Sequence, residues 1–458
     1  MTPPIVSPFR ISLIILLEGF VTISVEILAI RQLLPEVGSN IIITSLIIGV
    51  FLLFLAYGYQ AGGRKQGNLF KSLQRNFLLA AIGIGLGLSF IFIDAFFLMG
   101  RYLHMNLLWI LVIYLLLIIA PVVYFLGQTV PITMNLLPSQ SVGSLGGKVL
   151  HLSTIGSFLG AVLTTLLLMN LLGVAWTIIV NYLILAALIL LITPPPRLLI
   201  MISLLFLVGC FVYTVNRNME SHFFVATTPY GNYAIFKGQA HGQSGTKLEI
   251  NNSASSFITA EKKGYPYIEK IKDILFKQLA LKNKDILILG AGGFTLSAEN
   301  TYSNRFTYVD IEPRIYPIVQ QHFLKQIHGD FIAADARQYV REHPHSYDVI
   351  VSDTFSNIAS IPSQLLTVQY FLDLKNALKP NGIAIFNILA SPFLNSTYAK
   401  RVDNTLRAAF GSCMLAPLNF KGQGVGNNIY ICQDNKESQD KTIYTDNLNR
   451  SNLDVFFQ

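Results

Sequence analysis

Long apolar runs fill the first half of the chain, whereas short alternating runs fill the second. Seven of the apolar runs are long enough to cross a bilayer as helices, at about 11–30, 41–61, 77–100, 107–127, 149–169, 174–193 and 197–215. The first run ends at Arg31 without a small-residue cleavage site, so we interpret it as a retained helix and not as a signal peptide. The pattern predicts an α-helical polytopic membrane bundle at residues 1–220.

Acidic and small residues mark particular faces of these predicted helices. Glu18 and Glu26 share one face of the first helix, and acids inside a membrane are functional candidates, here for a cation path. Glu26 can alternatively pair with Arg31. Residues 121–137 contain two prolines and suggest a re-entrant element buried in protein. Small residues at helical spacing predict a close helix-packing face, namely Ser153, Gly156, Gly160 and Thr164.

Beyond about residue 220 the apolar positions alternate with a period of two, which indicates strands. Residues 223–228, 232–237 and 247–251 predict a small antiparallel β subdomain at 221–260. Strands at 285–290, 306–310, 329–333, 347–353 and 382–388 then alternate with helical segments. This order is typical of a parallel, doubly wound α/β sheet, so we expect a Rossmann-like domain at 261–435, followed by a polar tail at 436–458.

Composition excludes several classes of protein. Of the 458 residues, 52% are hydrophobic and 13% are charged, which excludes both intrinsic disorder and an ordinary cytosolic protein. The basic residues form no stripe with interleaved aromatics, so we expect no nucleic-acid partner. We expect instead that the basic loops lie against anionic lipid. Cys210, Cys413 and Cys432 lack disulfide or zinc spacing, which favours buried apolar packing. His343 and His345 lack a third ligand, so we expect no metal.

The side of the membrane on which the soluble domain lies is ambiguous. The loop at 64–75 is the most basic, so the positive-inside rule places it in the cytoplasm. Seven crossings would then leave the soluble domain outside. A domain that uses a cytosolic nucleotide donor should instead face the cytoplasm, and on this ground we expect a cytoplasmic soluble domain, with an even number of crossings or an exception to the rule.

A nucleotide-binding pattern follows the first strand of the predicted α/β domain. Gly290, Gly292 and Gly293 form a turn in which the backbone can approach a ligand closely, with a helical segment expected to follow. Asp310 ends the second strand about twenty residues later, where a carboxylate can accept both ribose hydroxyls. Asp335 and Asp353 end the third and fourth strands, so all three acids should meet in one crevice; each of the last two can alternatively be a helix N-cap.

These motifs resemble the polyamine aminopropyltransferase (spermidine synthase) family, and the first half resembles the membrane region of bacterial membrane-bound spermidine synthase-like proteins. In the soluble half, the resemblance rests on Thr228 to Tyr233, Tyr267 to Glu269, Leu289 to Gly292, Asp310 to Glu312, Ala334 to Ala336 and Val351 to Thr354. In the membrane half, it rests on Glu26 to Leu28, Gly62 to Arg64, Gly127 to Pro131 and Gly146 to Gly160.

The resemblance implies a site for decarboxylated S-adenosylmethionine or S-adenosylmethionine as co-substrate. It places the glycine turn under the thioether, Asp310 on the ribose and Asp335 beside the adenine amine. Asp353 would be the catalytic base, and Tyr230, Tyr267 and Glu269 would bind the substrate. It also implies a bacterial inner-membrane location and a possible homodimer.

Three positions depart from the family pattern. Gly293 stands where the glycine motif carries an acid, Asn251 begins the replacement of an Asp-Gly motif, and Ser356 replaces the second acid after the fourth strand. Carboxylates that hold cationic amines are therefore missing. The first hypothesis is a membrane-bound aminopropyltransferase with an amine acceptor. The alternatives are a methyltransferase acting on a membrane-delivered acceptor and a catalytically decayed nucleotide-binding sensor or transport partner.

Overall fold

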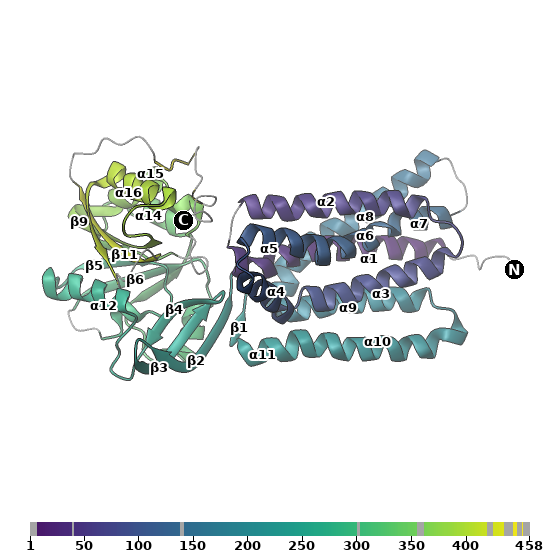
Figure 1. Cartoon of the computed structure of the whole chain (residues 1–458), viewed down its shortest axis with the longest axis horizontal. Helices are drawn as coiled ribbons and strands as arrows, with labels where there is room; N and C mark the ends of the chain where they lie inside the picture. Colours follow the sequence, from purple (N-terminus) through teal and green to yellow (C-terminus); the bar gives the residue numbers. More distant parts are fainter. Residues whose placement is uncertain are drawn as a thin grey trace. The chain divides into compact units, whose positions relative to one another are not determined.

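The computed structural model describes residues 7–38, 41–137, 142–299, 303–354, 361–418, 425–434, 443–446 and 451. The chain divides into two compact units (Figure 1). One unit comprises Met1–Val37 and Ile41–Pro229 and is helical, and the other comprises Gly38–Asn40 and Tyr230–Gln458 and is built on two sheets. The small β subdomain expected at 221–260 thus belongs mostly to the same unit as the α/β domain.

The helices of the first unit follow the apolar runs of the sequence. They are α1 (Pro8–Val37), α2 (Ile41–Gly63), α3 (Leu69–Gly87), α4 (Phe90–Tyr102), α5 (Leu107–Tyr114), α6 (Ala120–Gly127), α7 (Thr129–Leu136), α8 (Val142–Leu163), α9 (Val174–Leu191), α10 (Leu198–Tyr213) and α11 (Met219–Phe223). Short π-helical segments extend three of them, η1 (Leu115–Ile119), η2 (Thr164–Leu172) and η4 (Thr214–Asn218). In the described part of the chain, six helices are long and apolar enough to cross a membrane, or seven if α3 and α4 form one bent span.

The sharp bend lies between α3 and α4, and not at residues 121–137 where a re-entrant element was predicted. α3 and α4 meet at 69°, and the Ser89 hydroxyl caps the second of them by accepting from Phe92 N. Residues 107–136 instead form one long helix. Its two prolines lie in the first turns of α6 and α7, where a missing N–H costs little, so the helix continues through them.

The predicted small-residue face packs against α1. A Cβ at Gly156 or Gly160 would collide with the main-chain oxygen of Leu16 or Phe20, so α1 and α8 touch backbone to backbone. Thr164 continues the face and donates its hydroxyl to Ser24 Oγ at 2.8 Å. The small-residue prediction is confirmed for this pair of helices.

Substitution of Gly156 by alanine is therefore expected to destabilise the helical unit by about 1 to 3 kcal/mol, because a main-chain oxygen cannot move aside as a side chain can. Gly147 provides a matched control on the same helix, since a Cβ there meets nothing within 4 Å. Gly147→Ala should be neutral or stabilising by roughly 0.5 to 1 kcal/mol through helix propensity. Thermal unfolding of the purified full chain measures both. Equal melting temperatures for the two variants would contradict the packing.

The second unit begins with a hairpin sheet. Its strands are β2 (Asn232–Ala240), β3 (Gln243–Ile250) and β4 (Ser253–Ile258), with the two-residue β1 (Ala226–Thr227) before them. Asn251 and Asn252 form the turn between β3 and β4 with φ of +52° and +58°, a conformation that asparagine tolerates. The sequence prediction missed β4, whose serine-rich residues hide the alternation.

The larger sheet has seven strands in the order β10-β11-β9-β8-β5-β6-β7. The strands are β5 (Asp285–Leu289), β6 (Arg305–Asp310), β7 (Asp330–Ala333), β8 (Tyr347–Ser352), β9 (Leu378–Ala390), β10 (Gly411–Pro417) and β11 (Gly426–Asp434). β5 to β9 pair in parallel as predicted, whereas β11 runs antiparallel to β9 and β10, so the sheet is mixed. The C-terminal unit thus has a Rossmann-type fold with a mixed sheet.

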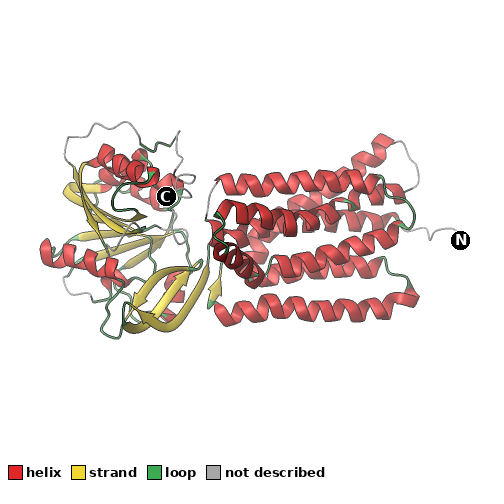
Figure 2. Ribbon diagram, in the orientation of Figure 1, coloured by secondary structure: helices red, strands yellow, loops and turns green. Residues whose placement is uncertain are grey.

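Helices cover the sheet (Figure 2). They are α12 (Pro266–Lys272), α13 (Ile315–His322), α14 (Ala336–Glu342), α15 (Val368–Ala377) and α16 (Thr397–Phe410), with π-helical η5 (Asp273–Gln278) after α12. Tyr339 of α14, Phe371 of α15 and Leu406 of α16 share one buried cluster with the strands. This layer fixes the sheet beneath the strand ends that carry the candidate site.

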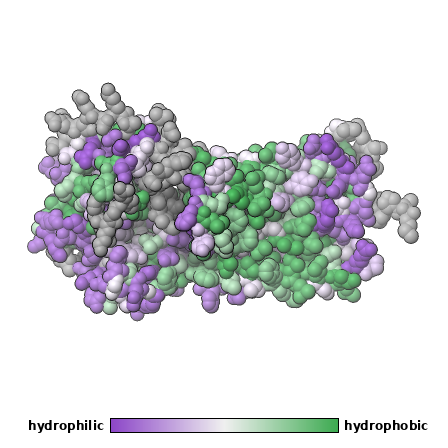
Figure 3. All heavy atoms as spheres, viewed as in Figure 1, coloured by the Kyte–Doolittle hydropathy of each residue, from purple (hydrophilic) through white to green (hydrophobic). Residues whose placement is uncertain are grey.

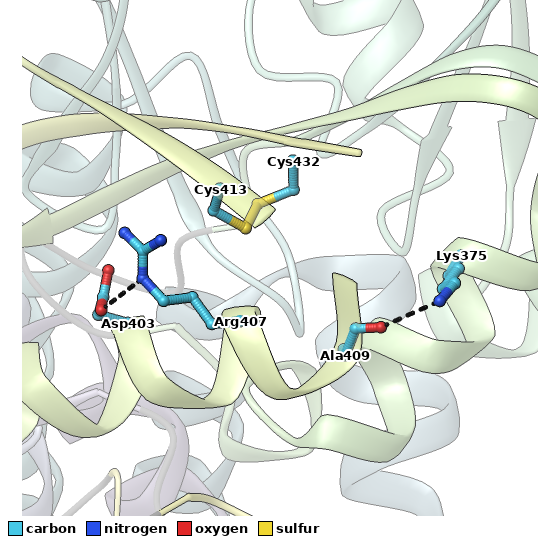
Figure 4. Close-up of a disulfide and its surroundings, with 6 residues drawn as sticks. All are labelled: Lys375, Asp403, Arg407, Ala409, Cys413 and Cys432. Carbon is cyan, nitrogen blue, oxygen red and sulfur yellow. Dashed lines mark hydrogen bonds and ion pairs between the residues drawn. A yellow bond between two sulfur atoms is a disulfide. The ribbon is translucent and has the colours of Figure 1, made fainter. Parts of the chain in front are cut away.

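One sequence prediction about this unit is wrong, that the cysteines form no disulfide. Cys413 and Cys432 pack in the interior, as predicted, but they also form a disulfide between β10 and β11 (Figure 4). The spacing of the two cysteines gave no hint, because the strand pairing that joins them was not predicted. The tail, predicted as polar, also returns to the domain: Tyr444 is buried in the core and Asp446 pairs with Arg337 at 2.7 Å. Cys210, in contrast, is exposed on α10.

Candidate donor and acceptor site

The glycine turn after β5 is held against the carboxyl ends of two neighbouring strands. Gly290 has a φ of +90°, and a Cβ there would collide with the main-chain oxygen of Asp353, so only glycine fits. Gly290 N donates to Val309 O at 2.9 Å, and Ala291 N donates to Asp310 Oδ2 at 2.9 Å. The turn therefore brings the ends of β5, β6 and β8 together, as the sequence predicts.

The helix expected after this turn is much shorter than predicted. Thr295–Ser297 form only a 3-10 turn, η6, within the described residues 291–299. This segment therefore does not offer the row of unpaired N–H groups that the start of an α-helix would offer to a ligand. Gly293 N instead donates to Ser256 Oγ of β4 at 2.8 Å, so the hairpin sheet also contributes to the site.

Asp310 anchors both the turn and its own strand end. Its Oδ2 accepts from Ala291 N, and its Oδ1 accepts from Glu312 N at 3.0 Å. Burial raises the pKa of Asp310, and the backbone N–H groups of Glu312 and Ala291 oppose that rise. A carboxylate can accept more hydrogen bonds than these backbone N–H groups supply, so Asp310 can also receive a ribose hydroxyl.

Asp353 follows β8 and lies at the centre of a polar cluster. Asn387 of β9 donates from Nδ2 to Asp353 Oδ1 at 2.9 Å, and the Tyr267 hydroxyl also hydrogen-bonds to the carboxylate. Burial raises the pKa of Asp353 above that of an ordinary aspartate, and these two hydrogen bonds reduce the rise. Asn427 in turn donates to Asn387 Oδ1 at 3.0 Å, which fixes the Asn387 amide with its N–H toward Asp353.

Tyr267 links this cluster to the hairpin sheet. Its single hydroxyl proton is shared between the Asp353 carboxylate and Ser255 O, which lies 3.2 Å away, and its ring stacks on Tyr265 with 6.4 Å between centroids. Burial, followed by the charge of Asp353, raises the pKa of Tyr267 well above its usual value, so the phenol stays protonated as a donor. The tyrosine thus faces the carboxylate from the opposite element to Asn387.

Other predicted site residues have mainly local partners. Asp335 is exposed and caps α14 by accepting from Gln338 N at 2.9 Å, as the N-cap alternative predicts. Glu269 accepts from Gly264 N at 2.7 Å and from Lys272 Nζ at 3.1 Å, so its carboxylate stabilises the start of α12. Tyr230 is exposed, and its carbonyl lies 3.4 Å from Asn251 Nδ2. These contacts give no support for Glu269 as a substrate ligand.

Gly293 and Asn251, which stand where the family pattern has acidic motifs, have other contacts in the structure. A Cβ at Gly293 would lie 2.5 Å from the ring of Phe323 and 2.7 Å from Ser256 Cβ, so neighbouring side chains fill the space that an aspartate would need. Asn251 accepts from Asn232 N at 3.0 Å, a structural role at its hairpin turn. Ser356 lies outside the described residues.

Sequence reasoning missed Asn387, Asn427 and Phe323. Asn387 is buried inside the apolar second part of β9, and this polar interruption near the strand end was the available signal. Phe323 gave none, because it belongs to the segment after α13 and reaches the turn only through the fold. No grouping of three or more histidine, cysteine, aspartate or glutamate side chains suited to a metal ion occurs among the residues that the structure describes.

Comparison with known proteins agrees with this geometry. Residues 266–440 match the sequence pattern of the spermine/spermidine synthase domain. These residues form a spermine/spermidine synthase domain. The synthase domain resembles the polyamine aminopropyltransferase of Sulfolobus acidocaldarius, with 30% identity over 168 residues that cover 34% of this chain and 52% of that protein. It also resembles the enzyme of the same name from Neisseria meningitidis, with 34% identity over 139 residues, or 29% and 51% of the two chains.

The chain spans about half the length of the curated relatives it matches. Among solved structures, the probable spermidine synthase of Corynebacterium glutamicum is similar, with 21% identity, coverage of 46% of this chain and 79% of that chain, and a TM-score of 0.39. Tyr230, Asn251 and Ser256 lie before the matched residues of the synthase domain.

Proposed function

We propose that the synthase domain transfers an aminopropyl group from decarboxylated S-adenosylmethionine, or a close relative, to an amine. The single observation that carries the proposal is Asp353, a half-buried carboxylate with a raised pKa beside the glycine turn and held by Asn387 and Tyr267. Asp310 and the turn would bind the adenosyl moiety. Asp335 would contact the adenine amine from its exposed cap, and Tyr230 and Tyr267 would line the acceptor side.

The chemistry needs one proton acceptor. The amine nitrogen attacks the methylene carbon next to the sulfonium, a C–N bond forms, and the C–S bond breaks with its electron pair going to sulfur. The product ammonium then loses a proton to the Asp353 carboxylate. A raised pKa favours this transfer, because it makes the carboxylate a better base at neutral pH.

A second candidate, methyl transfer from S-adenosylmethionine, is favoured by one observation. Phe323 and Ser256 occupy the space where an acid would repel the carboxylate of S-adenosylmethionine. The same remodelling weakens the grip on a cationic donor tail. A decayed, nucleotide-binding sensor is the third possibility and predicts binding without transfer.

The helical unit would anchor the protein in a lipid bilayer. Large apolar side chains are exposed on its outer surface, among them Leu53 of α2, Leu98 of α4 and Leu199 of α10. Figure 3 shows hydrophobic residues gathered over the part of the molecule that the helices form. Exposed apolar area on this scale is unfavourable in water and favourable in lipid.

A transfer assay with the full chain in lipid nanodiscs tests the proposal. Decarboxylated S-adenosylmethionine with putrescine or spermidine should yield methylthioadenosine and the extended amine, both measured by mass spectrometry. S-adenosylhomocysteine formed from S-adenosylmethionine would support methyl transfer instead. Donor binding without either product would overturn the enzymatic proposal.

Gly293→Asp is expected to disrupt the site by itself, because no room exists for its side chain beside Phe323. Combined with Phe323→Ala, the same aspartate should fit and repel the carboxylate of S-adenosylmethionine. Preference for the decarboxylated donor should then rise by about tenfold or more, or about 1.4 kcal/mol. Competition binding with both donors measures it, with Phe323→Ala alone as the control. An unchanged preference in the double variant would contradict the placement of Gly293 at the donor tail.

A further inference from the structure

The contacts within the helical unit define two ends. Gln74 Nε2 of α3 donates to Thr193 Oγ1 at 2.9 Å, and Asn135 Nδ2 of α7 lies 3.5 Å from Gly63 O of α2. One buried cluster joins Ile11 of α1 to Val130 of α7 and Val149 of α8. The starts of α1, α3 and α8 therefore lie at the same end as the last turns of α2, α7 and α9.

This end, which we call the basic end, carries seven basic residues: Arg10, Arg64, Lys65, Lys71, Arg75, Lys148 and Arg197. The described segments that form it, residues 7–17, 61–77, 130–137, 142–152 and 190–200, contain no aspartate or glutamate. All of them are short connections or helix ends, which is the setting in which the positive-inside rule holds best.

The opposite end is nearly balanced in charge. Arg101 pairs with Glu36 at 2.8 Å, and Arg217 lies 3.7 Å from Glu220. Arg31 donates to Thr228 O at 2.8 and 2.6 Å. The chain leaves the helical unit at this end, because α11 finishes at Phe223 and the next residues lead into the second unit.

The disulfide supplies an independent observation. Cys413 and Cys432 face each other in the register of β10 and β11 with 4.2 Å between their Cα atoms (Figure 4). Such bonds persist in oxidising compartments and are rare in the cytosol. A disulfide inside the synthase domain therefore indicates that the domain lies in an oxidising compartment.

We infer that the helical unit inserts with its basic end in the cytoplasm, so that the synthase domain lies on the opposite, oxidising side of the membrane. The inference rests on the proposed membrane anchoring, and it is the reverse of the expectation based on a cytosolic donor. Its consequence for function is that both donor and amine acceptor are drawn from the pool on that side. The acceptors are then amines outside the cytoplasm.

Cysteines introduced one at a time into a Cys210→Ser background, in which Cys413 and Cys432 stay bonded to each other, test the orientation in intact bacterial cells. Gln66→Cys lies at the basic end, and Ser244→Cys lies on β3 of the second unit; both positions are exposed. A membrane-impermeant maleimide should label Ser244→Cys in intact cells and Gln66→Cys only after permeabilisation. The reverse pattern would overturn the orientation while leaving membrane anchoring intact. Release of the chain by alkaline carbonate washing would instead overturn the anchoring, and the orientation with it.

The thiol state gives a second readout on the same cells. If cells are quenched in acid and alkylated without reductant, Cys413 and Cys432 should remain unmodified, and both should react after reduction. The Cys413→Ala, Cys432→Ala double variant controls for labelling elsewhere. Alkylation of both cysteines without reductant would contradict an oxidising location.

Discussion

Asp353→Asn is expected to lower the rate of group transfer by about 10² to 10⁴-fold while donor affinity changes little. Asparagine keeps the shape of the side chain and can still bond to Tyr267, but it cannot accept the proton that the attacking amine releases. Single-turnover kinetics together with donor titration separates the two quantities. Full activity in this variant would exclude Asp353 as the base.

A matched control lies on the same strand. Asp348 is near the start of β8 and pairs with Lys284 at 3.0 Å and with Lys379 at 2.9 Å, far along the strand from the glycine turn. Burial alone would raise its pKa, but hydrogen bonds from Asp285 N, Lys379 and Lys284 lower the pKa to about 2. Asp348→Asn should therefore lower the stability of the domain and leave the transfer rate nearly unchanged.

The same carboxylate predicts the pH dependence of the rate. Only ionised Asp353 can act as a base, so the rate should fall as pH drops through its raised pKa, which lies above the roughly 3.9 of an unperturbed aspartate. Asn387→Leu removes a hydrogen bond that favours the ionised form, so this acid limb should move to higher pH. A profile that is unchanged in Asn387→Leu would contradict the role of Asn387 in positioning Asp353.

Asp310→Ala is expected to weaken donor binding by roughly 10 to 150-fold, equivalent to about 1.5 to 3 kcal/mol for charge-assisted hydrogen bonds. The variant loses the acceptors for Ala291 N and Glu312 N as well as those for the ribose hydroxyls. Donor titration measures the affinity. Thermal unfolding without donor measures how much of the loss comes from a loosened turn.

The control for this variant is Asp330→Ala, which removes an exposed aspartate from the start of β7. β7 is the strand next to β6, which ends at Asp310. It should leave donor affinity unchanged. If Asp310→Ala bound the donor as tightly as the parent chain, the turn would not be the adenosyl site.

The central strands were predictable from the sequence because their apolar runs are buried on both faces. β5 and β8 are examples, and the glycine turn and Asp310 follow directly from the ends of such strands. β4, β10 and β11 were missed. β4 is rich in serine, and β10 is an edge strand among the strands that the structure describes, where the apolar pattern is weak.

Side-chain pairings across the chain could not be predicted in the same way. Asn387 meets Asp353 from 34 residues away, and Phe323 fills the space beside Gly293, so both depend on the register of strands and loops. The bend between α3 and α4 was also missed. The apolar run at 77–100 suggests one continuous helix, but Ser89 caps a new helix within it.

Calorimetric titration of the full chain in nanodiscs with decarboxylated S-adenosylmethionine tests whether an S-adenosyl nucleotide occupies the glycine turn beside Asp353. We expect saturable binding at one site per chain, weakened in Asp310→Ala and retained in Asp353→Asn. The absence of binding by either this donor or S-adenosylmethionine to the folded parent chain would contradict this expectation.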